Sequence, residues 1–312
     1  MLDDFIVSSF LITWLAASVR LAVPLLLTAL GEIFAERSGV LNVGIEGTIL
    51  LGALAAYLVT FNSGSPWLGF VVAILAGIFV SLFLAWMYVT VLANQVVVGI
   101  VFNILALGIA SYGYQLAAGS AANPELVPMF EGLHIPLLSD IPFFGPVLFS
   151  HSILLYLTIF AVFAAEFALF RTTFGLNMRA VGENPVAAAN AGISVPFMRY
   201  VGVLLSGAGA GAAGAYLVLA QVGLFRDTIV VGQGFIALAI VIFGRWRPIY
   251  AAIAAIAFGA ADALQLSLQL FAFDLPPQLL LSLPYVLTII AVSGLIGRAA
   301  QPAALMEPYR RS

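Results

Sequence analysis

The chain has 312 residues with a net charge of −3, and 63% of them are hydrophobic while only 8% are charged. Soluble globular domains carry roughly a quarter charged residues, so this composition excludes an ordinary soluble protein, and the missing basic excess gives nucleic-acid binding no support. The sequence has no cysteine and its 11 basic residues are all arginines, which excludes disulfides, a P-loop lysine and a lysine Schiff base.

Apolar runs long enough to cross a bilayer as helices recur along the whole chain, and the mean hydropathy is +1.14. The sequence therefore predicts an all-α integral membrane protein, a polytopic helix bundle with about nine (roughly 8–10) transmembrane segments in a single domain over residues 1–312. We expect the spans near 8–31, 41–60, 68–90, 95–117, 152–170, 200–220, 234–245, 249–271 and 280–297. The run 234–245 is short enough to belong to a broken or re-entrant segment.

The positions of the arginines predict the orientation, because short cytoplasmic loops collect Arg and Lys. If the segment 171–199 is cytoplasmic, nine of the eleven arginines lie on that side, and only Arg20 and Arg226 lie elsewhere. We therefore expect a cytoplasmic C-terminus and an extracytoplasmic N-terminus. The loop 118–151 is then extracytoplasmic, where it caps the bundle, meets a partner or simply connects two spans.

Small residues predict one close helix contact. Gly207, Gly211 and Ala215 follow one another at steps of four, on one face of the expected span 200–220. Such a stripe lets two helix backbones approach closely in lipid.

The segment 171–199 contains a short polar helix between two apolar spans. Asn184 is a suitable N-cap and Pro185 suits the first turn, while Gly192 is a suitable C-terminal glycine. We expect the helix over residues 186–191, lying across the membrane face with small alanines that let another protein approach. The alternative is an ordinary interhelical loop.

The pattern G-x-N-x-x-A-A-x-x-x-G-I in this segment resembles the coupling loop of ABC importer permeases. Val186 stands where an older form of that loop has glutamate, a departure typical of the branched-chain amino acid, sugar and nucleoside branch. Three further blocks, residues 36–47, 94–103 and 232–248, resemble the nucleoside and simple-sugar permeases. The chain is most similar to the shorter permease subunit of bacterial purine nucleoside importers. The residues that the resemblance assigns to ATPase coupling are Gly182, Asn184, Pro185, Ala187, Ala188, Gly192 and Ile193.

This resemblance implies the transmembrane subunit of an ATP-driven ABC importer that moves a nucleoside-type solute across the bacterial inner membrane. Its expected partners are ABC ATPase subunits, a second homologous permease that favours a heterodimer, an extracytoplasmic substrate-binding lipoprotein and membrane lipid. No cofactor is expected on this chain, because ATP and magnesium would bind the partner subunits, so the chain is not expected to be an enzyme. A simple sugar or riboflavin remains an alternative substrate, and a stand-alone secondary transporter is a less favoured alternative function.

A polar solute needs hydrogen-bonding groups inside an apolar bundle, and polar groups at membrane depth tend to face its interior. The candidates for this translocation pathway are Asn42, Glu46, Asn94, Gln95, Asn103, Gln221 and Gln233. Taken singly, each is more often a structural hydrogen bond than a substrate contact. Glu46 has two further alternatives, a proton relay or an ion pair with an arginine such as Arg37.

A membrane enzyme would need a cluster of acids, bases, nucleophiles or metal ligands. The two histidines, His134 and His151, have no metal-site spacing and are expected to be ordinary loop residues. The sequence predicts neither catalytic residues nor a metal site.

Overall fold

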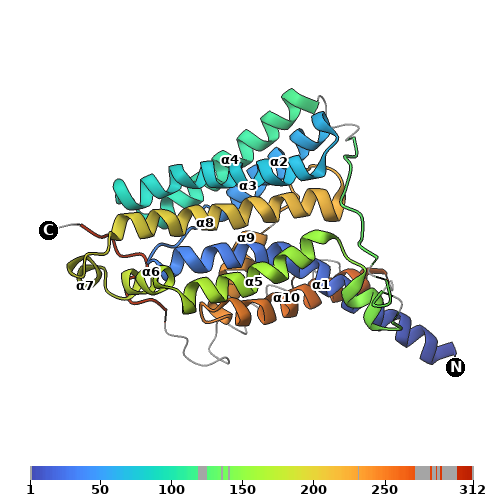
Figure 1. Ribbon diagram of the computed structural model, residues 1–312. Coiled ribbons are helices and arrows are strands. Elements are labelled where there is room, and N and C mark those ends of the chain that lie inside the picture. The colour runs from blue at the N-terminus through green and yellow to red at the C-terminus, as the bar shows by residue number, and fades with distance from the viewer. Residues whose placement is uncertain are drawn as a thin grey trace.

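The computed structural model describes residues 2–118, 125–134, 136–139, 141–230, 232–270, 282, 286, 289 and 301–310 (Figure 1). Throughout these residues the regular structure is helical, and the sole β-type pairing is an isolated bridge between Gly132 and Ser152. The long helices lie side by side. The short helices α6 and α7 and the C-terminal residues are at one end of the bundle, and the N-terminus is at the other.

The described long helices lie on the predicted apolar runs, with ends that differ by up to six residues, as at both ends of α1. The helices are α1 (Leu2–Arg37), α2 (Ile45–Ser63), α3 (Pro66–Ala85), α4 (Gln95–Ala118), α5 (Ile153–Arg171), α6 (Thr173–Glu183), α7 (Pro185–Asn190), α8 (Val195–Tyr216), α9 (Gln233–Phe243) and α10 (Pro248–Leu270). Helices α3 and α8 each continue into a wider π-helical turn, Trp86–Thr90 and Leu217–Val222, and a third such turn covers Gly145–Phe149.

Seven helices in the described part of the chain are long and apolar enough to cross a membrane: α1, α2, α3, α4, α5, α8 and α10. The expected short run 234–245 is α9, whose 11 residues extend about 16 Å and by themselves are too short for a core about 30 Å thick. The ninth expected span, 280–297, lies outside the described residues except for three isolated positions.

Helix α8 is the centre of the bundle. In the stretch of α8 that is long enough to span a membrane, 72% of the residues are buried, against 22% for the peripheral helix α4. Helix α8 packs against α1, α2 and α3. The predicted small-residue stripe makes the contact with α3, through Gly207 and Gly211, while Gly214 outside the stripe makes a close contact with α2. A Cβ on Gly211 would overlap the backbone of α3, and a Cβ on Gly214 would overlap that of α2. The prediction of a close helix contact is confirmed, because no other residue type permits this approach.

The connection between α4 and α5 packs along the end of the bundle opposite α6 and α7. The Val127 amide donates to the Gly223 carbonyl at 2.8 Å, and the Phe130 amide donates to the Leu219 carbonyl at 2.8 Å. The Phe130 ring meets Trp67 edge-on, with 4.9 Å between ring centroids. The described part of this loop therefore packs on the end of α8 and on α3.

Candidate functional site

Two predicted pathway residues of α4 hold the segment 38–44, which joins α1 to α2. The Gln95 Oε1 accepts a hydrogen bond from the Leu41 amide at 2.8 Å. The Asn103 Oδ1 accepts from the Gly47 amide at 2.8 Å, and its Nδ2 donates to a loop carbonyl at 2.9 Å. These side chains satisfy backbone groups that have no partner in a helix, which keeps a non-helical segment stable within an apolar bundle.

Asn42 belongs to a polar cluster that is completely buried. Its backbone amide donates to Glu32 Oε1 at 2.8 Å, and its side-chain Nδ2 donates to Ser206 Oγ at 3.0 Å. The Ser206 hydroxyl donates in turn to Glu32 Oε2 at 2.7 Å, and the Tyr88 hydroxyl donates to Asn42 Oδ1 at 3.4 Å. All four side chains are at most 2% exposed, so this cluster ties α1, α8 and the loop together at depth.

Glu46 holds the N-terminal end of α9. Its Oε1 accepts from the Gly232 amide at 2.6 Å and its Oε2 accepts from the Gly234 amide at 2.7 Å. A carboxylate at a helix N-terminus satisfies otherwise unpaired amides and lies at the positive end of the helix dipole. The alternative ion pair between Glu46 and Arg37 does not form, because each side chain is engaged with a different end of α9.

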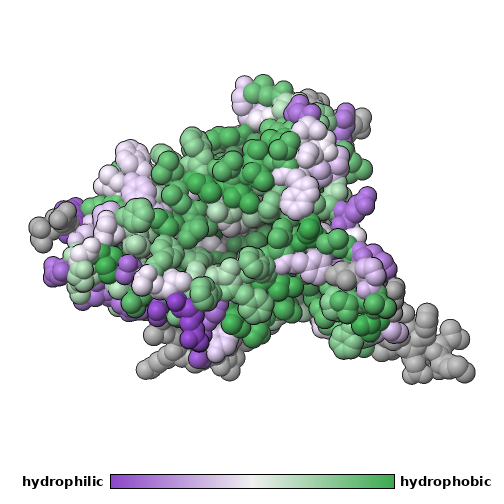
Figure 2. All heavy atoms as spheres, in the orientation of Figure 1, coloured by the Kyte–Doolittle hydropathy of each residue, from purple (hydrophilic) through white to green (hydrophobic). Residues whose placement is uncertain are grey.

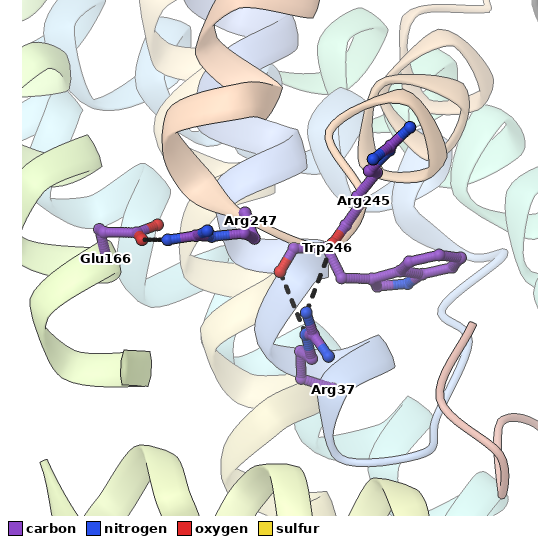
Figure 3. A network of polar contacts seen from close by, with 5 residues as sticks. All are labelled: Arg37, Glu166, Arg245, Trp246 and Arg247. Carbon is purple, nitrogen blue, oxygen red and sulfur yellow. Dashed lines mark hydrogen bonds and ion pairs between the residues drawn. The ribbon is translucent and has the colours of Figure 1, made fainter. Parts of the chain in front are cut away.

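The C-terminal end of α9 is held by the last turn of α1 (Figure 3). Arg37 donates to the carbonyls of Trp246 at 3.1 Å and Arg245 at 3.3 Å. The Trp246 indole donates to the buried Glu36 carboxylate. The segment from Glu36 to Glu46 therefore contacts α9 at both of its ends.

Arg247 directly precedes the first residue of α10, and its side chain points away from this contact toward α5 (Figure 3). It pairs with Glu166 at 2.5 Å. The hydrogen bond from this carboxylate raises the pKa of the Arg247 guanidinium above its usual value. Arg247 thus remains a cation at every pH at which the protein would be studied.

The other three predicted pathway residues lie apart from the loop contacts. Asn94 caps α4, accepting from the amides of the second and third following residues at 3.1 Å each. Gln221 donates to the Arg20 carbonyl at 3.2 Å. Gln233 is the first residue of α9, and its buried Oε1 accepts no hydrogen bond from another described residue.

The short helix predicted over residues 186–191 forms as α7, Pro185–Asn190, one residue earlier than expected. The Asn184 side chain accepts from the Ala187 amide at 2.9 Å, Pro185 is the first residue of α7, and Gly192 takes a φ of +85°. That φ is accessible to glycine at little cost, so the chain can reverse there.

The seven predicted coupling residues divide by exposure. Asn184, Ala187 and Gly192 are exposed, and Pro185 and Ile193 are half-buried. Gly182 and Ala188 are buried: Ala188 packs with Val181 and Val195, and a Cβ on Gly182 would overlap the end of α1.

The C-terminal residues 301–310 lie against this region. The Ala304 amide donates to the Gly182 carbonyl at 2.9 Å, and the Met306 amide donates to the Gly39 carbonyl at 3.1 Å. Arg199 of α8, only 1% exposed, donates to the Glu307 carbonyl at 2.8 Å. The tail therefore joins α6, the α1–α2 loop and α8.

Sequence reasoning missed five buried residues of the Asn42 cluster and of the contacts around α9: Glu32, Glu36, Tyr88, Ser206 and Trp246. A signal existed for the two acids, because they are four residues apart and lie on one face at the end of a long apolar helix. No local signal marks Ser206 or Trp246, whose partners are 174 and 210 residues away in the chain.

Two apolar cavities lie between the spanning helices. One of about 610 Å³ is lined by α2, α3, α4 and α8, and one of about 390 Å³ is lined by α1, α5 and α8. None of the seven predicted pathway residues lines either cavity.

Comparison with known proteins places these features in a family. The sequence model of the protein family "Branched-chain amino acid transport system / permease component" matches residues 14–292. No solved structure matches the chain.

Three curated relatives are similar over almost their whole length. The guanosine ABC transporter permease protein NupQ of Bacillus subtilis is 41% identical over 304 residues, covering 94% of this chain and 95% of the relative. The putative glucose ABC transporter permease protein TsgC13 of Haloferax volcanii is 36% identical over 330 residues, covering 97% and 99%. The nucleoside ABC transporter permease protein NupC of Lactococcus lactis subsp. cremoris is 36% identical over 300 residues, covering 93% and 94%. The membrane-spanning helices, the family match and these relatives show that the chain belongs to the family of permease components of branched-chain amino acid-type ABC transport systems.

Proposed function

We propose that this chain is the membrane-spanning subunit of an ATP-driven importer for a nucleoside-type solute. The observation that carries the proposal is the 41% identity to a guanosine permease, which extends over 94% of this chain. The nucleoside permease of Lactococcus supports the same substrate class. ATP and magnesium would bind separate ATPase subunits, and a binding lipoprotein would deliver the solute.

A simple sugar is the second candidate substrate, because the glucose permease relative covers 97% of this chain at 36% identity. Riboflavin remains a weaker alternative from the sequence resemblance. The stand-alone carrier is disfavoured by family membership.

In this proposal α7 is the coupling helix that docks on an ATPase subunit. Its support is the exposed face made by Asn184, Ala187 and Gly192 beside the buried Gly182 and Ala188. The buried pair would hold the helix on the bundle, and the exposed residues would touch the ATPase. Closure of two ATPase subunits would then shift the bundle between two arrangements through this contact.

We further propose that the solute passes between this chain and a second permease, in a heterodimer. Four of the seven predicted pathway residues hold backbone groups of the loop, of α2, of α4 and of α9, a fifth holds the Arg20 carbonyl, and the Asn42 side chain binds the Ser206 hydroxyl. Solute contacts from this chain would then come from polar groups that can re-pair, above all Gln233, whose Oε1 lacks a donor among the described residues. The pathway role of all seven remains a prediction.

The proposed arrangement in the inner membrane has about nine segments, a cytoplasmic C-terminus and an extracytoplasmic N-terminus. Its support is that α6, α7 and the tail 301–310 lie together at one end of the bundle, where Arg37, Arg171, Arg179 and Arg247 also cluster. Basic residues gather on the cytoplasmic side of membrane proteins.

Uptake of labelled guanosine, by cells that express the full complex with or without this chain, tests the proposal. Unlabelled adenosine, ribose, glucose and riboflavin serve as competitors. Saturable uptake that needs the chain and yields to adenosine, but not to the sugars, is the expected result. No chain-dependent uptake of guanosine, together with chain-dependent uptake of labelled ribose, glucose or riboflavin, would overturn the nucleoside assignment and leave the ABC architecture intact.

A further inference from the structure

A hollow of about 490 Å³ lies where α5 ends, beside the turn between α9 and α10. Its apolar side is made by Phe163 and Phe167, and its polar side by Glu166, Arg171 and Arg247. Figure 2 shows a hydrophilic patch next to extensive hydrophobic surface near this end of α5. The hollow thus has the two-sided chemistry of the boundary between lipid and water.

Positive charge accumulates around the hollow. The guanidiniums of Arg37, Arg179 and Arg247 lie 5.7, 4.9 and 4.9 Å from the centroid of the Phe170 ring. Arg171 is exposed and makes no ion pair or hydrogen bond with another described residue. Like charges held this closely repel one another, so an added anion is favoured.

The carboxylates in this region do not balance the arginines. Glu166 pairs with Arg247, and Glu183 acts on Arg37 over a longer range. Counting Arg171 with the three arginines on the Phe170 ring, four cations face three acids, since Glu36 also acts on Arg37. The second oxygen of Glu166 is buried and accepts no hydrogen bond from a described residue, so it can accept one from a ligand hydroxyl.

The apolar wall faces outward from the bundle. Phe163 and Phe167 are one helical turn apart on α5, and their side chains are 63% and 62% exposed. In a membrane-spanning helix such side chains meet acyl chains. The charged side of the hollow therefore lies next to its apolar side, as the phosphate of a phospholipid lies next to its acyl chains.

We propose that this hollow binds an anionic phospholipid with a hydroxyl-bearing headgroup, its phosphate between Arg171 and Arg247 and its acyl chains along Phe163 and Phe167. Guanidiniums hold phosphate oxygens with paired, charge-assisted hydrogen bonds. Basic pockets between membrane helices recognise anionic headgroups in this manner. Phosphatidylglycerol supplies the phosphate, and its glycerol hydroxyl meets the buried Glu166 oxygen.

The test is thermal unfolding of the purified full chain in neutral detergent while phosphatidylglycerol is titrated. Phosphatidylcholine with the same acyl chains and inorganic phosphate are titrated in parallel. The expected result is a saturable rise in Tm with phosphatidylglycerol and no rise with either comparator. Arg171→Gln should weaken the apparent affinity about five-fold, since one arginine near an anionic surface contributes about 1 kcal/mol.

Arg226→Gln is the matched control, because Arg226 is exposed and does not line the hollow. It should bind phosphatidylglycerol as the wild type does. An equal rise with phosphatidylcholine, the same rise with inorganic phosphate, or an unchanged affinity in Arg171→Gln would each overturn the proposal. Native mass spectrometry of the wild type is independent of any variant: retained phosphatidylglycerol is expected, and its absence after extraction from a membrane rich in it contradicts the assignment.

Discussion

Glu46 and Gly234 are 188 residues apart in the chain, and the carboxylate of one accepts the amide hydrogen of the other at 2.7 Å. Together with the bond to the Gly232 amide, this contact joins the start of α2 to the start of α9. At the other end of α9, Arg37 and Glu36 bind the turn that follows the helix. The short helix α9 is thus held at its two ends, by the Glu46 carboxylate at the first and by Arg37 together with Glu36 at the second.

Glu46→Ala should lower the free energy of unfolding by about 2–3 kcal/mol, because two part-buried amides at the start of α9 would lose their acceptor. Glu46→Gln should cost less, because the amide oxygen can still accept one of the two hydrogen bonds. Unfolding of the purified variants in detergent measures both values. Equal stability of Glu46→Ala and the wild type would contradict the capping role.

Gly211→Ala should destabilise the protein by about 1–3 kcal/mol, because the added Cβ has no space between α8 and α3. That atom would lie 3.0 Å from the Ala73 carbonyl carbon and 3.1 Å from the Ile74 Cα. Gly108→Ala is the matched control, because nothing lies within 4 Å of its built Cβ. Comparable melting of the two variants would show that the glycine stripe is not a packing contact.

Ala187→Asp should reduce coupled uptake at least about ten-fold. A loss of about 1.4 kcal/mol in the free energy of docking on the ATPase corresponds to a ten-fold weaker contact. Ala187 is exposed on α7, so this variant should fold and insert normally. Ala188→Asp places a charge in the packed contact with Val181 and Val195, and its defect should be one of folding. Uptake and melting measured on both variants separate the two effects. Normal uptake by a folded Ala187→Asp variant would contradict the coupling role of α7.

Arg199→Met should release the tail 301–310 from α8, because the hydrogen bond to the Glu307 carbonyl is lost. The chain has no cysteine, so a spin label on Met306→Cys, a residue 40% exposed, reports the tail alone. The label should be restricted in the parent and more mobile in the Arg199→Met variant, and Arg226→Met should not change it. An unchanged spectrum would show that the other tail contacts suffice.

The proposed orientation can be measured with the same cysteine-free background. Asn62 near the end of α2 and Val186 on α7 are both exposed, and the predicted layout places them on opposite sides of the membrane. A membrane-impermeant maleimide should label Asn62→Cys in intact cells and Val186→Cys only after permeabilisation. The reverse pattern would invert the layout.

Local chemistry determined several features from the sequence by itself. Apolar runs predicted the seven long helices, since a bilayer core requires such lengths whatever the helices pack against. Asn184, Pro185 and Gly192 predicted α7, because caps act within a few residues of the helix that they end. The spacing of four residues between Gly207 and Gly211 predicted a close helix contact, because residues four apart lie on the same face of a helix.

Only the tertiary structure decided what the polar residues bind. Asn42, Glu46 and Asn103 look alike in sequence as polar groups within apolar runs, yet each meets a partner that is 56 to 188 residues away. The fold also separated the coupling residues, burying Ala188 and exposing Ala187, although the two are neighbours in one motif. A buried polar group is stable only with a partner, and the chain must first pack before that partner is near.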